Sequence, residues 1–205
     1  MYTLFIKRFL DVFIALLALF LFSPIFFIVS ISLFFSNRGK IFFTQTRAGK
    51  NQELFKILKF KSMNDKKDES GKLLKDTERL TFMGKIIRKT SIDELPQIFN
   101  ILKGEMSIVG PRPLLPEYLP YYGSYFLRRH ELKPGITGLA QVSGRNTLKF
   151  SERFTLDVRY IDNCSFLLDA KILFKTFLKI ISTKDIQIGK KLSDLDDVGV
   201  SQGLE

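Results

Sequence analysis

Two adjacent carboxylates, Asp93 and Glu94, are the residues of this 205-residue chain whose types and spacing best suit catalysis. They stand at the start of an apolar stretch with helical spacing. Asp93 is the predicted N-cap, because Pro96 then falls at the third helical position, where no backbone donor is needed. Ser91 would complete a capping box with Glu94, but would leave Pro96 one position too deep. A cap of this kind stabilises a helix by about 0.3–1 kcal/mol, so a structural role and a chemical role both remain open.

The chemistry open to such a pair is limited by geometry. Adjacent side chains on a helix point about 100° apart, so the pair cannot flank one glycosidic bond as a hydrolase pair does. One carboxylate can instead attack phosphorus or ligate Mg²⁺, while the other moves a proton. Phosphoryl transfer depends on positioning and charge neutralisation, so this role requires cations nearby.

Arg112 is the best candidate for such a cation, because it stands between two prolines in the run Gly110-Pro111-Arg112-Pro113. Prolines restrict the backbone on both sides, and an arginine held in this way suits bidentate binding of phosphate or carboxylate. A tight turn with a solvated arginine is the alternative. Lys59 and Lys61 share one face of an expected strand and are either solvated or part of the same site.

The charge balance indicates an anionic partner, since 32 lysines and arginines against 21 acidic residues give a net charge of +11. Nucleic acid, anionic lipid and phosphorylated substrates all fit this charge. Cys164 is the only cysteine and His130 the only histidine. A disulfide within the chain and a cysteine zinc site are therefore excluded, and any metal should be a hard cation held by oxygens.

A membrane segment is predicted from the run Val12 to Phe35, which contains no charged residue. A straight helix of that length reaches about 36 Å, enough to cross a bilayer core of about 30 Å. Ser23-Pro24 lies near its middle, and basic residues flank both ends. The positive-inside bias then favours both ends in the cytoplasm, as in a helix-break-helix that enters one leaflet and returns. A kinked spanning helix is the alternative.

The expected fold is α+β and mostly helical, with a re-entrant N-terminal membrane helix, a small β-hairpin and amphipathic interfacial helices. We expect a membrane segment over 1–36, a catalytic domain over 37–182 and a polar, mobile tail over 183–205. Three glycines within 133–146 allow close backbone approach to a ligand. The expected strands are Ile41–Thr46, Phe55–Ser62 and Met106–Val109, with a loop at Met63–Glu78. The expected helices are Arg79–Thr90, Leu114–His130 (interrupted by Pro116 and Pro120), Phe150–Asn163 and Ser165–Ser182. Lys103-Gly104 is expected to end the helix after the carboxylates.

The motifs, in their order along the chain, resemble those of the monotopic bacterial sugar transferases. These are phosphoglycosyl transferases, which move a sugar 1-phosphate from a nucleotide sugar to a polyprenyl phosphate. The resemblance covers roughly residues 3–182, and the ordered set of motifs is highly specific. It is carried by Lys7-Arg8 with Asp11, Ser23-Pro24, Lys59–Met63, Ser91–Gln97, Gly110–Leu114 and Pro134–Asn146.

The resemblance implies a mechanism and a cofactor. Asp93 would be the nucleophile that forms a covalent phosphosugar intermediate with release of UMP, and Asp93 and Glu94 together would hold Mg²⁺. Glu94 would otherwise deprotonate the acceptor. Ser23-Pro24 would form the break in a re-entrant membrane helix. The residues implied to bind the phosphate or the nucleotide are Lys59, Arg88, Arg112 and Arg145.

The implied substrates are a UDP-sugar and undecaprenyl phosphate at the cytoplasmic face of the bacterial inner membrane, with downstream glycosyltransferases as further partners. Within the family the sequence most resembles members that transfer N,N'-diacetylbacillosamine 1-phosphate in protein N-glycosylation, although Ser143 stands where that pattern has Asn. The same reaction with UDP-galactose, UDP-glucose or a UDP-N-acetylhexosamine, for capsule or O-antigen, is the alternative. Larger relatives carry transmembrane helices before this core, so the chain is expected to be a minimal catalytic unit.

Two functions outside this class also fit parts of the sequence. A nucleic-acid binder would explain the net charge, but no DNA- or RNA-reading motif is visible, so nucleic acid is not an expected partner. A basic membrane-surface scaffold would explain the apolar run, but has no need of two carboxylates beside a proline-clamped arginine. Release of UMP from UDP-sugars separates the enzyme from both.

Overall fold

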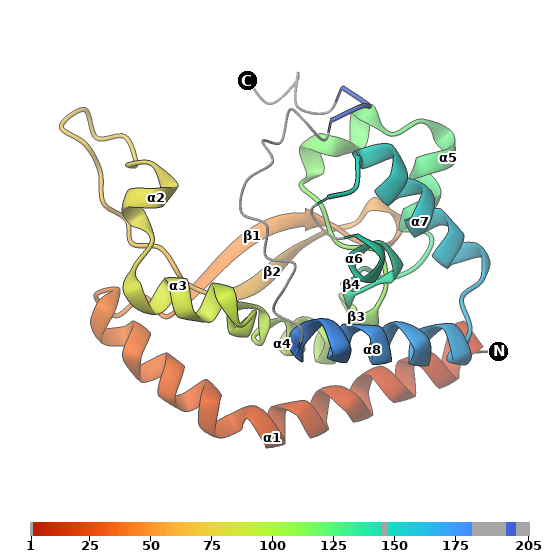
Figure 1. Cartoon of the computed structure of the whole chain (residues 1–205), viewed down its shortest axis with the longest axis horizontal. Helices are drawn as coiled ribbons and strands as arrows, with labels where there is room; N and C mark the ends of the chain where they lie inside the picture. The colour runs from red at the N-terminus through yellow and green to blue at the C-terminus, as the bar shows by residue number, and fades with distance from the viewer. Residues whose placement is uncertain (1, 145–146, 182–195, 200–205) are drawn as a thin grey trace.

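The apolar N-terminal segment forms one continuous helix, α1 (Lys7–Ser36), after a short π-helical turn, η1 (Tyr2–Ile6). The computed structural model describes residues 2–144, 147–181 and 196–199. In it α1 is bent into an arch that runs beneath the rest of the molecule (Figure 1). The break predicted at Ser23-Pro24 is thus a bend within a continuous helix and does not interrupt it.

The bend has a local cause, because Pro24 lies inside α1 and has no N–H to donate to the Phe20 carbonyl. The Ser23 hydroxyl donates to that same carbonyl at 2.8 Å. A side chain thus replaces the hydrogen bond that proline removes, as an apolar surrounding requires. This replacement explains how the helix continues through the Ser-Pro pair.

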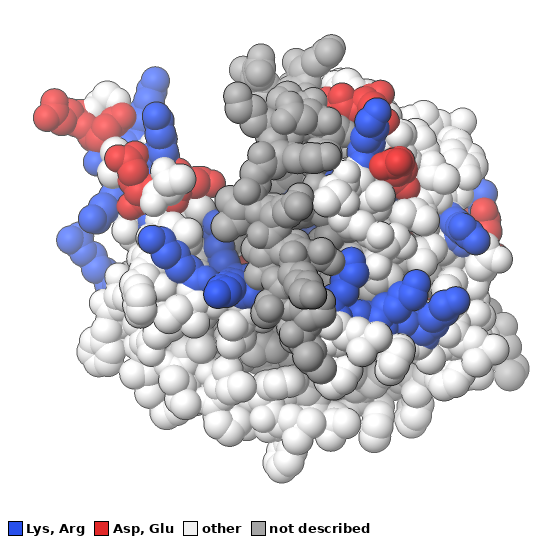
Figure 2. All heavy atoms as spheres, in the orientation of Figure 1, with Lys and Arg blue, Asp and Glu red and all other residues white. Residues whose placement is uncertain are grey.

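Both halves of α1 pack against the same globular body. Ala15 in the first half is buried in a cluster with Ile101, and Leu33 in the second half is buried in a cluster with Ile87. The stretch between them is exposed: Phe20 is 77% exposed, and only 11% of the apolar window of α1 is buried. Figure 2 shows a face without charges along this margin and a band of Lys and Arg above it. Among the described residues, α1 is the one helix long and apolar enough to cross a membrane.

Two small sheets lie above the arch. Strands β1 (Phe42–Ala48) and β2 (Leu54–Phe60) form the predicted antiparallel hairpin, with Gln45 opposite Ile57. Strands β3 (Ser107–Val109) and β4 (Gly135–Thr137) pair in parallel. The shorter helical elements are η2 (Lys50–Gln52), α2 (Asp76–Arg79), α3 (Phe82–Lys89), η3 (Ile92–Glu94), α4 (Gln97–Lys103), η4 (Pro116–Tyr121), α5 (Ser124–Leu127), η5 (Arg128–His130), α6 (Leu139–Ser143), α7 (Phe150–Asp162) and α8 (Phe166–Ile181).

The mostly helical α+β fold with its hairpin is therefore confirmed, as are the last two helices. In the view of Figure 1, α3, α4 and α8 lie in a row between the arch and the sheets, and α5 and α7 form the far side of the body. The chain from the end of β2 to α3 projects from this body as an arm that carries α2 (Figure 1).

The helix predicted over Arg79–Thr90 is confirmed over Phe82–Lys89, as α3, but its predicted start is wrong. Helix α2 ends at Arg79 and α3 begins at Phe82, because Thr81 between them is extended. The Thr81 hydroxyl accepts from the Gly84 N–H at 2.9 Å. An N-cap of this kind begins a new helix. The chain therefore changes direction at Thr81, although the apolar spacing alone predicted a continuous helix.

The interrupted helical region predicted over Leu114–His130 is confirmed in part, since η4, α5 and η5 follow one another there, but the interruption does not fall at the prolines. Both prolines of the region fall within η4, and Pro120 supplies no donor for a longer helix. Gly123 then takes an extended conformation and separates η4 from α5.

Two of the glycines of 133–146, Gly135 and Gly138, pack against the backbone of Gly110, whereas the sequence left room for close approach to a ligand. A Cβ on Gly135 would lie 2.1 Å from the Gly110 nitrogen, and one on Gly138 would lie 2.2 Å from the Gly110 carbonyl oxygen. The absence of these side chains lets β4 meet the loop after β3. That contact sets the base of the turn that carries Arg112.

The division into parts at residues 36 and 182 stays a prediction, as does the mobility of the tail. Of the tail over 183–205, only residues 196–199 are described. There the Asp197 carboxylate accepts from the Ser151 N–H at 3.0 Å, at the start of α7.

Candidate active site

The two carboxylates lie in a tight turn between α3 and α4. Ser91 takes a left-handed conformation with φ of 57°, η3 follows, and Pro96 is the residue before α4. Asp93 as N-cap is therefore wrong: the chain closes a 3₁₀ turn instead, with the Glu94 N–H bonded to the Ser91 carbonyl at 3.1 Å. A left-handed non-glycine residue costs about 1–2 kcal/mol, a strain that is common at functional sites. The predicted helix end is confirmed, since Gly104 has φ of 90°.

Glu94 is held by two cations. Its Oε1 atom accepts from Lys59 Nζ and from Arg112 Nη2, both at 2.8 Å. Burial opposes the charged form, but the charges of Arg112 and Lys59 more than offset this and lower the pKa of Glu94 to about 2. Glu94 is thus ionised at neutral pH, and it fixes two of the predicted substrate-binding residues.

Asp93 has different surroundings. Burial raises the pKa of Asp93 and the neighbouring charge of Glu94 adds to this, while Lys59, Arg88 and Arg112 oppose it. Its carboxylate makes no hydrogen bond or ion pair to another residue that the structure describes. The two adjacent acids therefore differ in their surroundings: Glu94 is paired with two cations, whereas the Asp93 carboxylate is available to a ligand.

The structure gathers most of the predicted site residues. Arg88 donates from Nε to the Ser62 hydroxyl at 2.8 Å, and its charge acts on Asp93. Arg145 lies outside the described residues. Ser23-Pro24 belong to the arch and not to this site.

A small pocket opens beside Glu94, with room for a few water-sized groups in about 50 Å³. Two polar residues of its lining, Arg47 and Gln97, were not among the predicted site residues. Arg47 had a usable signal, because the hairpin register and the alternation of side chains place it on the same face as Lys59. The pocket is lined by Arg47, Ile57, Lys59, Glu94, Gln97, Arg112, Pro113 and Leu114.

The turn that carries Arg112 is fixed by a buried ion pair behind it. Arg129 Nη2 donates to the Arg112 carbonyl at 2.8 Å and to Asp157 at 2.7 Å. The side chains of Arg129 and Asp157 are 2% and 4% exposed. Next to this pair, His130 Nδ1 donates to the Gly49 carbonyl at 2.8 Å. The rigid placement of Arg112 thus depends on residues distant in sequence, which the two prolines alone did not reveal.

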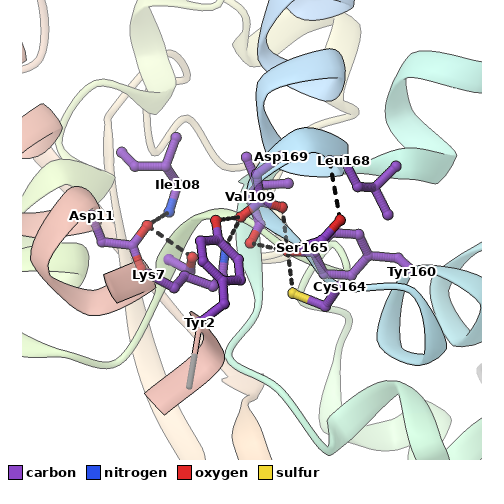
Figure 3. Close-up of polar contacts among 11 residues, drawn as sticks. Tyr2, Lys7, Asp11, Ile108, Val109, Tyr160, Cys164, Ser165, Leu168 and Asp169 are labelled. Atoms are coloured by element: carbon purple, nitrogen blue, oxygen red, sulfur yellow. Dashed lines mark hydrogen bonds and ion pairs between the residues drawn. The ribbon is translucent and has the colours of Figure 1, made fainter. Parts of the chain in front are cut away.

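A buried polar cluster ties the start of the arch to the body (Figure 3). We call it the anchor cluster; its members are Tyr2, Lys7, Asp11, Tyr160 and Asp169. Lys7 Nζ pairs with Asp169 at 2.5 Å. Asp11 accepts from the Ser107 hydroxyl and from the Ile108 N–H, both at 2.9 Å.

Arg8 connects the arch to the carboxylate turn. Its guanidinium donates to the carbonyls of Ile101 and Leu102 at 2.6 and 2.9 Å, in the last turn of α4. A cation at that end also interacts favourably with the helix dipole. Because α4 follows the carboxylate turn, these hydrogen bonds fix the position of the arch relative to the site.

The two carboxylates fit Mg²⁺ as part of a ligand set. Mg²⁺ takes oxygen ligands and usually binds one or two carboxylates together with substrate phosphates and water. Asp93 and the Oε2 atom of Glu94 are the available donors, because both cations bind Oε1. No cluster of three or more metal-ligating side chains occurs among the described residues. The ion would thus share its coordination with substrate oxygens.

An exposed apolar arch beside a basic pocket with two unlike carboxylates suggests a membrane-associated protein with a site for an anionic substrate. Residues 2–183 match the bacterial sugar transferase family model. The chain belongs to this family and is an enzyme of the transferase class.

Three relatives illustrate the relationship. The chain is 53% identical over 147 residues to the uncharacterized sugar transferase EpsL of Bacillus subtilis, covering 72% of this chain and 73% of that protein. It is 40% identical over 183 residues to the UDP-glucose:undecaprenyl-phosphate glucose-1-phosphate transferase of Klebsiella pneumoniae (84% of this chain, 39% of that protein). It is 38% identical over 186 residues to the UDP-N-acetylgalactosamine-undecaprenyl-phosphate N-acetylgalactosaminephosphotransferase of Aeromonas hydrophila (87% of this chain, 44% of that protein).

Proposed function

We propose that the chain transfers a sugar 1-phosphate from a UDP-sugar to undecaprenyl phosphate and releases UMP, as the first membrane step of glycoconjugate assembly. The activities for which the Klebsiella and Aeromonas relatives are named support the donor class and the acceptor. The observation that carries the proposal is the unequal pair: Glu94 is held by two cations, while the Asp93 carboxylate makes no hydrogen bond or ion pair among the described residues. Such a pair offers a nucleophile beside a fixed charge, within a group of phosphate-binding cations.

The proposed first half-reaction is attack on phosphorus. An Asp93 carboxylate oxygen bonds to the phosphorus that bears the sugar, and the bond from that phosphorus to the bridging oxygen breaks. UMP leaves with the bridging oxygen and its electron pair. Lys59, Arg88 and Arg112 offset the negative charge that would otherwise repel a carboxylate nucleophile.

The second half-reaction regenerates the enzyme. A phosphate oxygen of undecaprenyl phosphate attacks the same phosphorus, and the bond between that phosphorus and the Asp93 oxygen breaks. The second pKa of a phosphate monoester is about 6, so the acceptor is largely dianionic at neutral pH. A general base is then dispensable, and a carboxylate with a pKa of about 2 accepts protons poorly. We therefore favour metal binding and positioning over proton transfer as the role of Glu94.

Mg²⁺ is the proposed cofactor, held by Asp93 and Glu94. When bound, it supplies positive charge at the phosphate oxygens and orients them. Activity should vanish with EDTA and return with Mg²⁺ or Mn²⁺; full activity after exhaustive chelation would rule the cofactor out.

We further propose that α1 enters one leaflet of the bacterial inner membrane and returns, with the catalytic body on the cytoplasmic side. Two observations support this topology: both halves of α1 pack on one body, and the middle of the arch is apolar and exposed. In a variant with Cys164→Ser, cysteines at positions 3 and 40 should both be protected from a periplasmic thiol reagent. Labelling of position 3 alone in intact cells would show a spanning helix.

For the sugar we propose N,N'-diacetylbacillosamine, on the sequence resemblance, with downstream glycosyltransferases using the lipid-linked product. Glucose, galactose and an N-acetylhexosamine are the alternatives, and the Klebsiella and Aeromonas relatives act on two of these classes. Release of UMP over a panel of the four UDP-sugar classes, with undecaprenyl phosphate present, should single out one donor.

The covalent step is tested by intact-protein mass spectrometry. With UDP-sugar and no acceptor, the wild-type chain should gain the mass of one phosphosugar, the Asp93→Asn chain should gain none, and steady-state kinetics should be ping-pong. Absence of the adduct together with kinetics that require a ternary complex would make Asp93 a metal ligand only and the transfer direct.

A further inference from the structure

Arg47 is the one cation of the pocket that neither the motifs nor the resemblance singled out. It lies near the end of β1, on the face of the hairpin that also carries Lys59. Its Nη2 atom donates to the neutral amide oxygen of Gln45 at 2.7 Å. Its Nε atom is buried and has no hydrogen-bond partner among the described residues. An arginine held in this way has hydrogen-bonding capacity that the protein itself does not use.

The charges that line the pocket do not balance. Arg47, Lys59 and Arg112 contribute three positive charges, and Glu94 is the only acid in the lining. Because Glu94 pairs with Lys59 and Arg112 through one oxygen, Arg47 has no carboxylate partner there. Burial and the charge of Arg112 lower the pKa of Arg47, and the opposing effects of Tyr118, Glu117 and Glu94 do not offset them. The surplus corresponds to a dianion, and the pocket's size suits a phosphate group better than a nucleotide.

We propose that Arg47, with Arg112, forms a subsite for the dianionic phosphate of a phosphate monoester, and so is a further substrate-binding residue of the reaction proposed above. Two monoesters take part in that reaction: UMP, whose phosphate gains its second charge as the diphosphate bond breaks, and undecaprenyl phosphate. The diphosphate of the UDP-sugar carries one charge per phosphate, so it fits the surplus less well. Arg47 therefore acts on the departure of UMP or on capture of the acceptor, and little on binding of the donor.

The test compares Arg47→Gln with Lys56→Gln, a matched loss of one positive charge. Lys56 is exposed on the neighbouring strand of the same hairpin and lies outside the pocket. Three quantities are measured: inhibition by UMP together with the rate of UMP release before acceptor is added, the KM for undecaprenyl phosphate, and the KM for UDP-sugar. Loss of a charge-assisted bidentate contact should change one of the first two by about 10- to 100-fold. Arg47→Lys should recover part of that loss, and Lys56→Gln should change neither quantity by more than about 2-fold.

The pattern of effects identifies the ligand. A weaker UMP inhibition with slower UMP release assigns the subsite to the leaving group, and a raised acceptor KM alone assigns it to the lipid phosphate. The proposal is overturned if Arg47→Gln alters neither, if it raises only the KM for UDP-sugar, or if its sole effect is a lower melting temperature. Failure of the wild-type chain to release UMP would instead defeat the proposed function, and binding of UMP by calorimetry to wild-type and Arg47→Gln chains would then still test the subsite.

Discussion

The anchor cluster and the charged residues of the active site differ in how far their side chains are paired. In the anchor cluster, Lys7 and Asp169 are both buried and paired, and Tyr160 donates a further hydrogen bond to Asp169 at 2.8 Å. In the site, neither Arg47 nor the Asp93 carboxylate forms an ion pair among the described residues, although the charges of nearby cations act on Asp93. Both groups combine lysine or arginine with aspartate or glutamate, so composition alone does not separate them.

The difference shows how one fold uses charge for two purposes. A buried polar network is tolerable when every member is satisfied, and then it fixes a single arrangement. The anchor cluster meets this condition and joins the arch to α8 (Figure 3). The site leaves positive charge and one carboxylate without ion pairs, which costs stability, and an anionic substrate supplies partners for the cations.

The largest expected effect comes from Asp93→Asn. The amide keeps the shape but is not a nucleophile, so UMP release should fall by at least about 10³-fold. The melting temperature should stay the same or rise, because burial and the charge of Glu94 disfavour the charged form of this half-buried carboxylate. Asp162→Asn, at an exposed acid paired with Arg128, is the matched control and should keep full activity. Turnover within about 10-fold of wild type in Asp93→Asn would contradict the assignment.

Breaking the anchor cluster should affect stability instead of chemistry. Lys7→Met leaves Asp169 buried and unpaired, which should cost about 3–5 kcal/mol in the free energy of unfolding. The double variant Lys7→Met/Asp169→Leu should recover part of this loss, because no unpaired charge remains, although the Tyr2 and Tyr160 hydroxyls lose their acceptor. Lys40→Met breaks an exposed pair with Asp65 and should cost less than about 1 kcal/mol. Chemical denaturation in a mild detergent measures the free energy of unfolding of all three variants. Equal losses in Lys7→Met and Lys40→Met would show that the buried pair is no more important for stability than the exposed one.

The pH dependence should separate the two carboxylates of the site. Because the pKa of Asp93 is raised, UMP release should decline on the acid side at a pH above the ordinary aspartate value, as the nucleophile takes up a proton. Glu94, with its pKa lowered to about 2, stays ionised throughout that range. Its contribution to stability is present above the ordinary glutamate pKa of 4.5 and is lost as the pH falls toward 2.

A second variant sharpens this comparison. Arg112→Gln removes a charge that opposes protonation of Asp93, so the acid limb of the pH–rate profile should move to higher pH. A profile that does not move would indicate that a group other than Asp93 controls the limb.

The smallest expected effect is at the bend of the arch. Ser23→Ala leaves the Phe20 carbonyl without the hydroxyl that replaces the proline donor, and should cost about 1–2 kcal/mol. Ser36→Ala is the matched control, since the Leu33 carbonyl that it contacts already accepts from the Asn37 N–H at 2.9 Å. Thermal unfolding in detergent compares the two, and equal losses would mean that the Ser23 hydroxyl contributes nothing specific.

The sequence by itself determined the parts whose signals are local. The uncharged run over 12–35 predicted the apolar helix, period-two and helical spacing predicted the hairpin and the last two helices, and Gly104 ended α4 as expected. The ordered motifs also identified the family. These properties depend on residues a few positions apart, where backbone preferences and apolar periodicity act directly.

Only the tertiary structure decided which charges meet and which remain without a partner. Neither the Lys7–Asp169 pair nor the support of Arg112 by Arg129 can be derived from spacing, because the partners come from distant parts of the chain. The unlike pKa values of Asp93 and Glu94 have the same origin, since burial and the cations around them belong to the folded chain. Local pattern fixes which elements form, but long-range packing sets the electrostatic environment of each side chain.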